Sequence, residues 1–383
     1  MSTTPRVRLI TTVLVTTVIA VVPADPALAA SWSVTTTPNP LPAGDHYTGI
    51  DAQSTSAAWA VGWGYTDGQL SVRPVVARWN GTAWSSATTP TLSGDGYLFG
   101  VDGDATSNVW TVGQVGTGTL IERWNGSSWS RVSSPLPSTA TSGTLSGVKA
   151  LAGNSAWAVG TAGYSTSPFS RSLIMRWNGT SWSSVPSPNP DSNTNLLNAV
   201  DASGPNDAWA VGNFGNDGYG GTADGMVFRW NGSAWSNVAL PAFDGKLRRL
   251  RLDDVVALAG NDVWVVGVGF SWQTFNRVPY ILHWNGSTWQ QATLPSAPSG
   301  EFRSVTALSP TKVYAVGRRD TGQTFVARWN GSTWSIESTP SPGTWHNLVS
   351  ASATGTGTVW AVGYRQNSAG GALRTLAVRS TNG

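Results

Sequence analysis

Short runs in which bulky and small side chains alternate recur along this chain at a nearly fixed interval. Within one run, Trp59 and Val61 fall on one side of a strand, and Ala58 and Ala60 on the other, because side chains alternate across a sheet. Successive runs lie 46 to 55 residues apart, an interval typical of repeat architectures. The run reads Trp-Ala-Val-Gly, or a close variant of it, from Trp59, Trp110, Trp157, Trp209, Trp264, Tyr314 and Trp360.

A second run, Arg-Trp-Asn-Gly-x-x-Trp, follows each of the first six copies. Its Asn-Gly step favours a two-residue hairpin of type I′, in which Trp79 would oppose Thr82. Every copy is also an Asn-x-Ser/Thr sequon, and we interpret it as a turn signal rather than a glycan attachment site. Nineteen of the 22 tryptophans occupy recurring positions, which indicates a core role. The run begins at Arg78, Arg123, Arg176, Arg229, His283 and Arg328.

Each repeat therefore contains four short segments of strand character separated by turn residues. The last repeat ends at Asn382-Gly383 without its fourth segment, whereas Ser31–Val34 matches that missing segment. Pairing of these chain ends would close the array and remove its open edge. The sequence predicts an all-β fold, a seven-bladed β-propeller with four antiparallel strands per blade and an N-terminal strand that completes the last blade.

The order of bulky residue, Val-Gly, variable loop, hydrophobic strand, turn and Trp resembles the kelch-type repeat of galactose-oxidase-like propellers. The resemblance covers the whole chain after residue 29 and implies the propeller fold. The kelch double glycine is absent, as Gly160-Thr161 and Gly317-Arg318 show. The chain has no cysteine, so the copper chemistry of galactose oxidase, which uses a cysteine cross-linked to tyrosine, is not implied.

The first 29 residues have the pattern of a secretory signal peptide. Arg6 and Arg8 precede an apolar stretch from Leu9 to Val22, and Ala27-Leu28-Ala29 fits a cleavage site. We therefore expect a signal at 1–29 and a single propeller at 30–383 that is secreted, extracellular, monomeric and free of a membrane anchor after cleavage. With 23 basic and 20 acidic residues the chain is too weakly charged for a nucleic-acid partner.

Loop lengths divide the predicted propeller into two faces. Connections between the first and second strands are nearly constant, as are the Asn-Gly hairpins. The other connections vary in length and carry the tryptophans that lie outside the repeat, and loops on a rigid scaffold usually hold binding residues. An alternative is that these rings only cap the channel mouth. The aromatic ligand-binding candidates on this variable face are Trp63, Tyr65, Trp272, Trp345, His346 and Tyr364.

The start of each first strand lies near the same mouth. Asp254 and Arg303 supply an acid and a base and complete the list of ligand-binding candidates; a water-filled channel is the alternative interpretation. These strand starts are expected to form a mostly polar ring at the channel mouth. By position in the repeat, the ring consists of Thr48, Phe99, Ser146, Asn198, Asp254, Arg303 and Asn347.

The sequence contains no clear catalytic motif. The three histidines lack metal-ligand spacing, so we expect no metal and no cofactor. Asp244, Asp253, Asp254 and Glu301 lie close enough in the repeat to leave a paired-carboxylate enzyme open. The sequence favours a non-enzymatic, lectin-like binding module for a glycan or cell-surface polymer. The alternatives are an extracellular glycoside hydrolase or polysaccharide lyase with acids at the channel mouth, and an extracellular protein-interaction scaffold.

Overall fold

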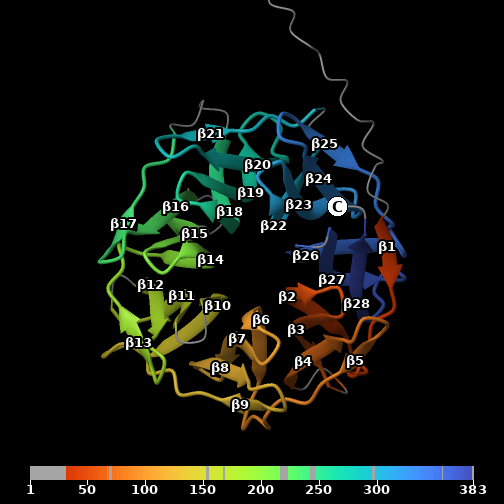
Figure 1. Cartoon of the computed structure of the whole chain (residues 1–383), viewed down its shortest axis with the longest axis horizontal. Helices are drawn as coiled ribbons and strands as arrows, with labels where there is room; N and C mark the ends of the chain where they lie inside the picture. The colour runs from red at the N-terminus through yellow and green to blue at the C-terminus, as the bar shows by residue number, and fades with distance from the viewer. Residues whose placement is uncertain are drawn as a thin grey trace, which may run out of the picture.

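A computed structural model shows a ring of seven four-stranded antiparallel sheets (Figure 1). It describes residues 32–66, 68, 71–151, 155–166, 169–215, 223–241, 247–295, 298–355 and 357–381. The predicted signal segment lies outside these residues. In the described part of the chain, no helix is long and apolar enough to cross a membrane.

The strands of each blade follow one another outward from the axis (Figure 1). Blades 1 to 3 consist of β2 (Asp45–Ser54), β3 (Ala57–Tyr65), β4 (Val72–Trp79) and β5 (Trp84–Ser86); β6 (Gly96–Ala105), β7 (Asn108–Val115), β8 (Gly118–Trp124) and β9 (Trp129–Arg131); and β10 (Ser142–Leu151), β11 (Ser155–Gly163), β12 (Ser170–Trp177) and β13 (Trp182–Val185). Blades 4 and 5 consist of β14 (Asn195–Gly204), β15 (Asp207–Gly215), β16 (Ala223–Trp230) and β17 (Trp235–Asn237); and β18 (Leu247–Ala259), β19 (Asp262–Ser271), β20 (Arg277–Trp284) and β21 (Trp289–Gln291). Blades 6 and 7 consist of β22 (Gly300–Ser309), β23 (Lys312–Arg319), β24 (Thr324–Trp329) and β25 (Trp334–Glu337); and β26 (Trp345–Thr354), β27 (Thr358–Gln366), β28 (Leu373–Ser380) and β1 (Trp32–Thr35).

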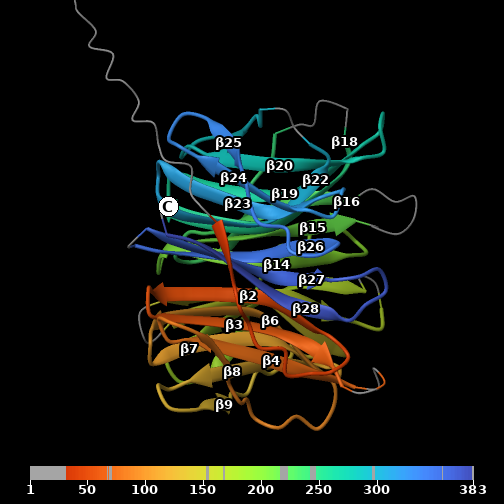
Figure 2. The same ribbon diagram turned by 90° about the vertical axis from the view of Figure 1, so that its right-hand side faces the viewer.

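The first and last strands close the ring as predicted. β1 pairs antiparallel with β28, with Trp32 opposite Ser380 and Thr35 opposite Ala377. The Trp32 ring packs edge-on against Tyr314 of blade 6 at 6.2 Å. Its Nε1 donates a hydrogen bond to Glu337 Oε2 at 2.6 Å. Figure 2 shows the ring from its side, with β1 running beside blade 7. The N-terminal strand therefore supplies the outer tryptophan that blade 7 lacks.

Repeated tryptophans form the core between neighbouring blades. Trp157 of blade 3 is fully buried and packs against Trp230 and Trp235 of blade 4, each with its ring centre 5.1 Å away. Trp360 of blade 7 contacts Trp79 of blade 1 in the same way, at 5.0 Å. Burial of these large rings stabilises the ring of blades, because each removes much apolar surface from water. The predicted core role is confirmed for the recurring tryptophans other than Trp284 and Trp329, which are partly exposed.

The Asn-Gly hairpins differ from the predicted two-residue turn. Trp177 pairs directly with Trp182, so the loop between them has four residues. Asn178 Oδ1 accepts hydrogen bonds from Thr180 N at 2.9 Å, Thr180 Oγ1 at 2.8 Å and Ser181 N at 2.9 Å. Only the glycine needs the left-handed region, with φ of +99° at Gly179. The asparagine acts as a side-chain acceptor rather than as a positive-φ residue, and the sequon hydroxyl is its donor. The same acceptor pattern occurs at Asn80, Asn125, Asn231, Asn285 and Asn330.

Every inner strand carries a β-bulge on the side of the variable loops. In blade 3 the register shifts between Leu145 and Gly147, and equivalent shifts occur in the other six blades. The bulge explains the glycine of Trp-Ala-Val-Gly, because a Cβ on Gly160 would lie 2.0 Å from the carbonyl oxygen of Thr144. Bulges bend a strand and re-aim its side chains, and here they turn the start of each inner strand toward the mouth of the channel.

Candidate functional site

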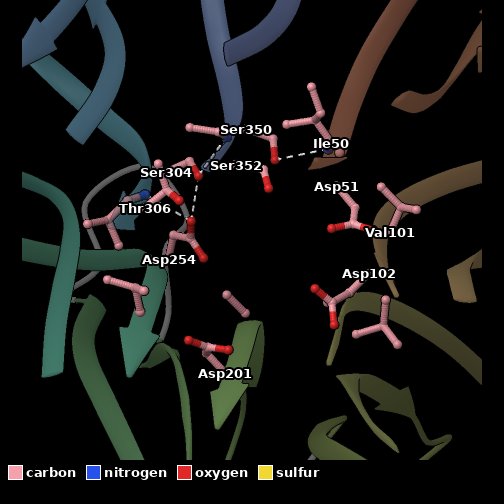
Figure 3. Close-up of a pocket in the computed structure, with 18 of the residues that line it drawn as sticks. Ile50, Asp51, Val101, Asp102, Asp201, Asp254, Ser304, Thr306, Ser350 and Ser352 are labelled. Atoms are coloured by element: carbon pink, nitrogen blue, oxygen red, sulfur yellow. Dashed lines mark hydrogen bonds between the residues drawn. The ribbon is translucent and has the colours of Figure 1, made fainter. Parts of the chain in front are cut away.

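A channel of about 490 Å³ runs along the axis and is lined by the inner strands of all seven blades. Aspartates from four blades point into it, as Figure 3 shows for Asp51, Asp102, Asp201 and Asp254. The inner strands form the open edges of their sheets, so their backbone N–H groups need acceptors from elsewhere.

The channel carboxylates provide those acceptors. Asp102 Oδ2 accepts from Ala150 N of the next blade at 2.7 Å, and Asp201 Oδ2 accepts from Ala257 N at the same distance. Ser352 takes the equivalent place in blade 7 and accepts from Ala52 N at 3.0 Å. These side chains therefore join neighbouring inner strands around the axis, which is a structural role.

The charge of the channel is partly compensated by Lys149. Its Nζ lies 3.0 Å from Asp201 Oδ1 and 3.7 Å from Asp102 Oδ1, and these two carboxylates raise the lysine pKa. Burial raises the pKa of Asp102 to about 6, and burial together with the neighbouring Asp102 raises the pKa of Asp51 well above its ordinary value. Over the described ranges, no group of three or more His, Cys, Asp or Glu side chains is placed to hold a metal ion.

The expected polar ring at the mouth is wrong in two blades, because the position counted along the repeat is off by one residue in blade 5 and by two in blade 7. The bulged residue of blade 5 is Asp253 rather than Asp254, and that of blade 7 is Val349 rather than Asn347. Asp254 instead lies in the channel, where its Oδ2 accepts from Ser304 Oγ at 2.6 Å and from Val305 N at 2.9 Å. Burial raises the pKa of Asp254 to about 7.

A continuous row of rings lies on the variable-loop face, and we name it the aromatic arc. Trp63 is its centre, stacked on His46 at 4.3 Å and edge-on to Tyr97 at 5.3 Å. His46 in turn meets Tyr364 at 4.8 Å, and Tyr364 meets Trp345 at 5.4 Å. The arc consists of Phe99, Tyr97, Trp63, Tyr65, His46, Tyr364 and Trp345 from blades 2, 1 and 7.

A groove of about 550 Å³ lies beside the arc, between blades 1 and 7. Tyr65 and His46 line one side of it, and Gln366 and Leu373 line the other. The tyrosine ring is only partly buried. The groove therefore offers an aromatic wall to a ligand that lies across the blade boundary.

An arginine cluster continues this surface onto blades 6 and 5. Glu301 is almost fully buried at its centre; Arg318 Nε lies 2.9 Å from Oε1, and Arg251 Nη2 lies 3.1 Å from Oε2. Arg303 and Arg277 approach the same carboxylate at 3.3 and 3.8 Å. Although burial alone would raise it, the surrounding guanidinium groups, Arg303 foremost, lower the pKa of Glu301 to about 2.

The cluster keeps an excess of positive charge. Its four arginines face three carboxylates, since Asp253 contacts Arg251 at 2.9 Å and Asp320 contacts Arg277 at 2.7 Å. Arg318 also joins the cluster to the arc, because its guanidinium lies over the Trp345 ring at 5.4 Å. Rings and guanidinium groups thus form one surface that follows the channel mouth across blades 2, 1, 7, 6 and 5.

The structure brings five of the eight predicted site residues into this surface: Trp63, Tyr65, Trp345, Tyr364 and Arg303. His346 is excluded, since it is 2% exposed and both its backbone N and its Nδ1 bond to the Gly322 carbonyl oxygen. Asp254 belongs to the channel. Trp272 lies in the loop after β19 and is 52% exposed.

Sequence reasoning missed His46 and the three arginines Arg251, Arg277 and Arg318 as site residues. A signal for most of them existed. Trp63, Arg318 and Tyr364 all follow the repeat glycine directly, and their cross-strand partners are His46, Glu301 and Asn347. In blades 3 and 4 the same positions hold Thr161 with Thr144 and Asn213 with Leu196. The paired position after the repeat glycine therefore marks the mouth.

The paired-carboxylate arrangement receives little support from the geometry. Glu301 stays ionised because its pKa is about 2, so it cannot act as a proton donor near neutral pH. Asp253 is held by Arg251 and Arg303, and Asp254 is held by strand N–H groups. Asp244 lies outside the described residues.

No protein-family model and no curated protein matches this chain. Among solved structures, it is similar to YCF48 bound to a D1 peptide, with a TM-score of 0.56 and 15% identity over 94% of this chain and 99% of that one. YCF48 from Cyanidioschyzon merolae matches with a TM-score of 0.56 and 16% identity, over 92% and 98% of the two chains. An ulvan lyase bound to -[GlcA(1-4)Rha3S]- matches with a TM-score of 0.53 and 12% identity, over 90% and 94%. At these identities the likeness shows the propeller fold alone, and the kelch-type relationship is not confirmed.

Proposed function

We propose that this chain is a secreted binding module whose variable-loop face takes up an anionic glycan or cell-surface polymer. The observation that carries the proposal is the contact between Arg318 and Trp345, which joins the aromatic arc and the arginine cluster into one surface. An acidic sugar chain can stack on the rings and pair its anionic groups with the guanidinium groups of such a surface.

The aromatic arc suits the apolar faces of sugar rings. Trp63, Tyr97, Tyr364 and Trp345 are each partly exposed, so their edges and faces reach the solvent. Rings of this kind hold a ligand by stacking while a few polar groups fix its orientation. Since the arc spans three blades, it can contact several successive sugar units.

The arginine cluster suits carboxylate or sulfate groups. A guanidinium group presents a planar fork of donors that matches such anions in a bidentate geometry. Glu301 holds Arg251, Arg303 and Arg318 in place before any ligand arrives, which reduces the entropy lost on binding. The uncompensated positive charge then favours an anionic ligand over a neutral one.

The structural neighbours are compatible with this proposal without identifying the ligand. One is a lyase bound to a glucuronate-containing sulfated saccharide, and another is bound to a peptide. A peptide is therefore the competing ligand class for the same face.

An array of neutral, uronate-containing and sulfated glycans together with acidic peptides tests the proposal on the purified chain without residues 1–29. We expect binding of acidic glycans, weakened about tenfold or more by Trp345→Ala and by Arg318→Gln, as for a site residue of hot-spot character. Phe169→Ala is the matched control, since Phe169 is an aromatic residue of blade 3 that is 56% exposed and lies outside the arc. Binding of peptides alone, or equal binding by all three variants, would contradict the proposal.

A polysaccharide lyase is the second candidate, and His46 is the observation that favours it. Burial lowers the pKa of His46, which keeps the imidazole neutral and able to accept a proton. It lies 4.8 Å from the Tyr364 ring and 6.4 Å from the Tyr65 ring. Incubation with a bound polyuronate, followed by ultraviolet absorbance of an unsaturated uronate, separates the candidates. Turnover that His46→Ala abolishes would establish the lyase.

A further inference from the structure

A second candidate site lies at the hairpin end of the blades, in one of the slots between neighbouring hairpins. In most slots an arginine from the third strand of one blade lies over two tryptophan rings. The guanidinium carbon of Arg176 is 5.1 Å from the ring centre of Trp157 and 5.6 Å from that of Trp230. Arg78, Arg123 and Arg379 have equivalent pairs of contacts, between 4.9 and 5.8 Å. A guanidinium group over an indole face is a favourable cation–π arrangement.

The slot between blades 5 and 6 lacks this arginine. His283 takes its position, stacks on Trp264 at 4.0 Å and places its Nε2 2.8 Å from Asp262 Oδ1. The next tryptophan, Trp329, keeps its usual place, since its ring centre lies 5.2 Å from that of Trp264, against 5.1 Å for Trp157 and Trp230. The slot therefore keeps its aromatic walls but has a shorter side chain between them.

A pocket opens at this place. It has a volume of about 440 Å³, and its walls include Trp264, His283 and Trp329. Trp329 is partly exposed, whereas Trp230, which Arg176 covers, is only 5% exposed. Trp284 is partly exposed as well, although Arg229 lies over the neighbouring Trp209 at 4.8 Å, with its Nε 2.8 Å from Asp207 Oδ1. The tryptophan at the end of a third strand is thus shielded from solvent where a guanidinium group lies over its ring.

A second replacement coincides with the first. Gln290 lies directly opposite His283 on the neighbouring strand. The equivalent position holds serine in the other hairpins, for example Ser183 opposite Arg176. Gln290 and Gln291 both line the pocket, together with Ser332 and Thr333 of the blade 6 hairpin. Blade 5 therefore departs from the repeat twice, and both departures face the same pocket.

We propose that this pocket binds the guanidinium group of an arginine side chain on a partner polypeptide. The guanidinium group of the partner would take the place that an arginine of this chain, such as Arg176, holds in the other slots. The Trp329 face provides the cation–π contact, and the side-chain oxygens of the glutamines and of the hydroxyl residues accept hydrogen bonds from the donor fork. Asp262 adds negative charge at the position where Asp207 holds Arg229 in blade 4. An uncharged ligand would use only part of this chemistry.

The test compares binding of the capped tripeptides Gly-Arg-Gly, Gly-citrulline-Gly and Gly-Lys-Gly by titration calorimetry. We expect the arginine peptide to bind at one site per chain and at least tenfold more tightly than the citrulline peptide. The variant His283→Arg with Gln290→Ser restores the repeat and fills the slot with its own guanidinium, so it should lose this binding while melting at or above the parent temperature. Binding at the loop face should remain, which separates this proposal from the proposed function.

The converse variant, Arg229→His with Ser236→Gln in blade 4, where Asp207 is equivalent to Asp262, should create a second slot and raise the stoichiometry from one to two. If this variant fails to fold, the restored variant still decides the question. Equal binding of the arginine and citrulline peptides, or unchanged binding in the restored variant, would overturn the proposal. Binding of methyl glycosides that the restored variant abolishes, without binding of the arginine peptide, would assign the pocket to sugars instead.

Discussion

At the hairpin end of the blades six turns share one hydrogen-bond pattern, whereas at the loop end no two neighbouring blades present the same side chains. Asn125 and Asn178 hold their loops with identical acceptor contacts. At the loop end, the position after the repeat glycine holds Trp63 in blade 1, Thr161 in blade 3 and Arg318 in blade 6. The bulge beneath that position is common to all seven blades. A constant backbone with variable side chains is typical of a recognition surface on a rigid scaffold.

The largest loss of stability is expected at the closure of the ring, which belongs to neither the hairpin end nor the loop end of the blades. Deletion of residues 32–35 exposes the edge of β28 and leaves Tyr314 and Glu337 without their contacts to Trp32. The loss should exceed the cost of about 3–5 kcal/mol typical for removal of one buried tryptophan ring. Thermal unfolding and light scattering measure it. A deletion variant that melts like the parent and stays monomeric would contradict the closed ring.

The next largest loss of stability distinguishes the repeated tryptophans from the unrepeated ones. Trp157→Ala removes a fully buried ring from the core between blades and should cost about 3–5 kcal/mol of unfolding free energy. Trp345→Ala removes a partly exposed ring from the arc and should cost about 1 kcal/mol or less. Urea denaturation of both variants checks the difference. Equal losses would show that the arc is part of the structural core.

A buried acid gives a pH-dependent test within the core. Burial raises the pKa of Glu122 from 4.5 to about 7, with an opposing contribution from Arg131. The folded protein therefore binds more protons than the unfolded chain between these values. The contribution of Glu122 to the unfolding free energy should fall by about 3 kcal/mol as pH rises from 4.5 to about 7 and then stay level.

Glu122→Met is the matched variant, because Met175 holds the equivalent place in blade 3. It should make the slope shallower, because Asp102 and Asp254 still titrate in this range, and it should raise the melting temperature at pH values above about 8, where the carboxylate of the parent is charged. Denaturation curves across the pH range measure both quantities. An unchanged slope in this variant would show that Glu122 does not contribute to the pH dependence.

A small loss of stability is expected at the hairpin end. Gly126→Ala forces a residue with a side chain to adopt φ of +99° and should cost about 1 kcal/mol. Asn125→Ala removes the acceptor for Ser127 and Ser128 and should cost a similar amount. Neither change should alter ligand binding at the loop face. A loss of glycan binding in either variant would break the division between the two ends.

Most of the fold was predictable because the sequence repeats at a nearly constant interval. The interval between Trp59 and Trp110, and the match of Ser31–Val34 to later segments, predict the blade number and the closure. The hairpin was predicted with the wrong loop because Asn178 satisfies the turn through its side chain, which the pair Asn-Gly alone does not reveal. The bulge was also unpredicted, and Asp254, which was expected at the mouth, lies one residue beyond the bulged Asp253 and in the channel.

The site was predictable only in part, since its residues come together through ring closure and register. Trp63 and Tyr364 stand out in sequence as unrepeated aromatics, and the structure places both in the arc. Arg318 follows the repeat glycine as Trp63 and Tyr364 do, but its role also depends on Glu301 across the strand and on Trp345 from the next blade. Contacts between blades are set by packing geometry, and a single sequence carries no local signal for them.

The most direct test of the central claim is titration of the parent and of Arg318→Gln with one acidic oligosaccharide taken from the array, at low and at higher salt. The account predicts that the parent binds the acidic oligosaccharide more tightly than its neutral counterpart and that salt weakens this binding. The variant should bind about tenfold more weakly and show a smaller salt dependence. Equal affinities for the acidic and neutral sugars, or an affinity that Arg318→Gln leaves unchanged, would contradict the assignment of the loop face as an anionic-glycan site.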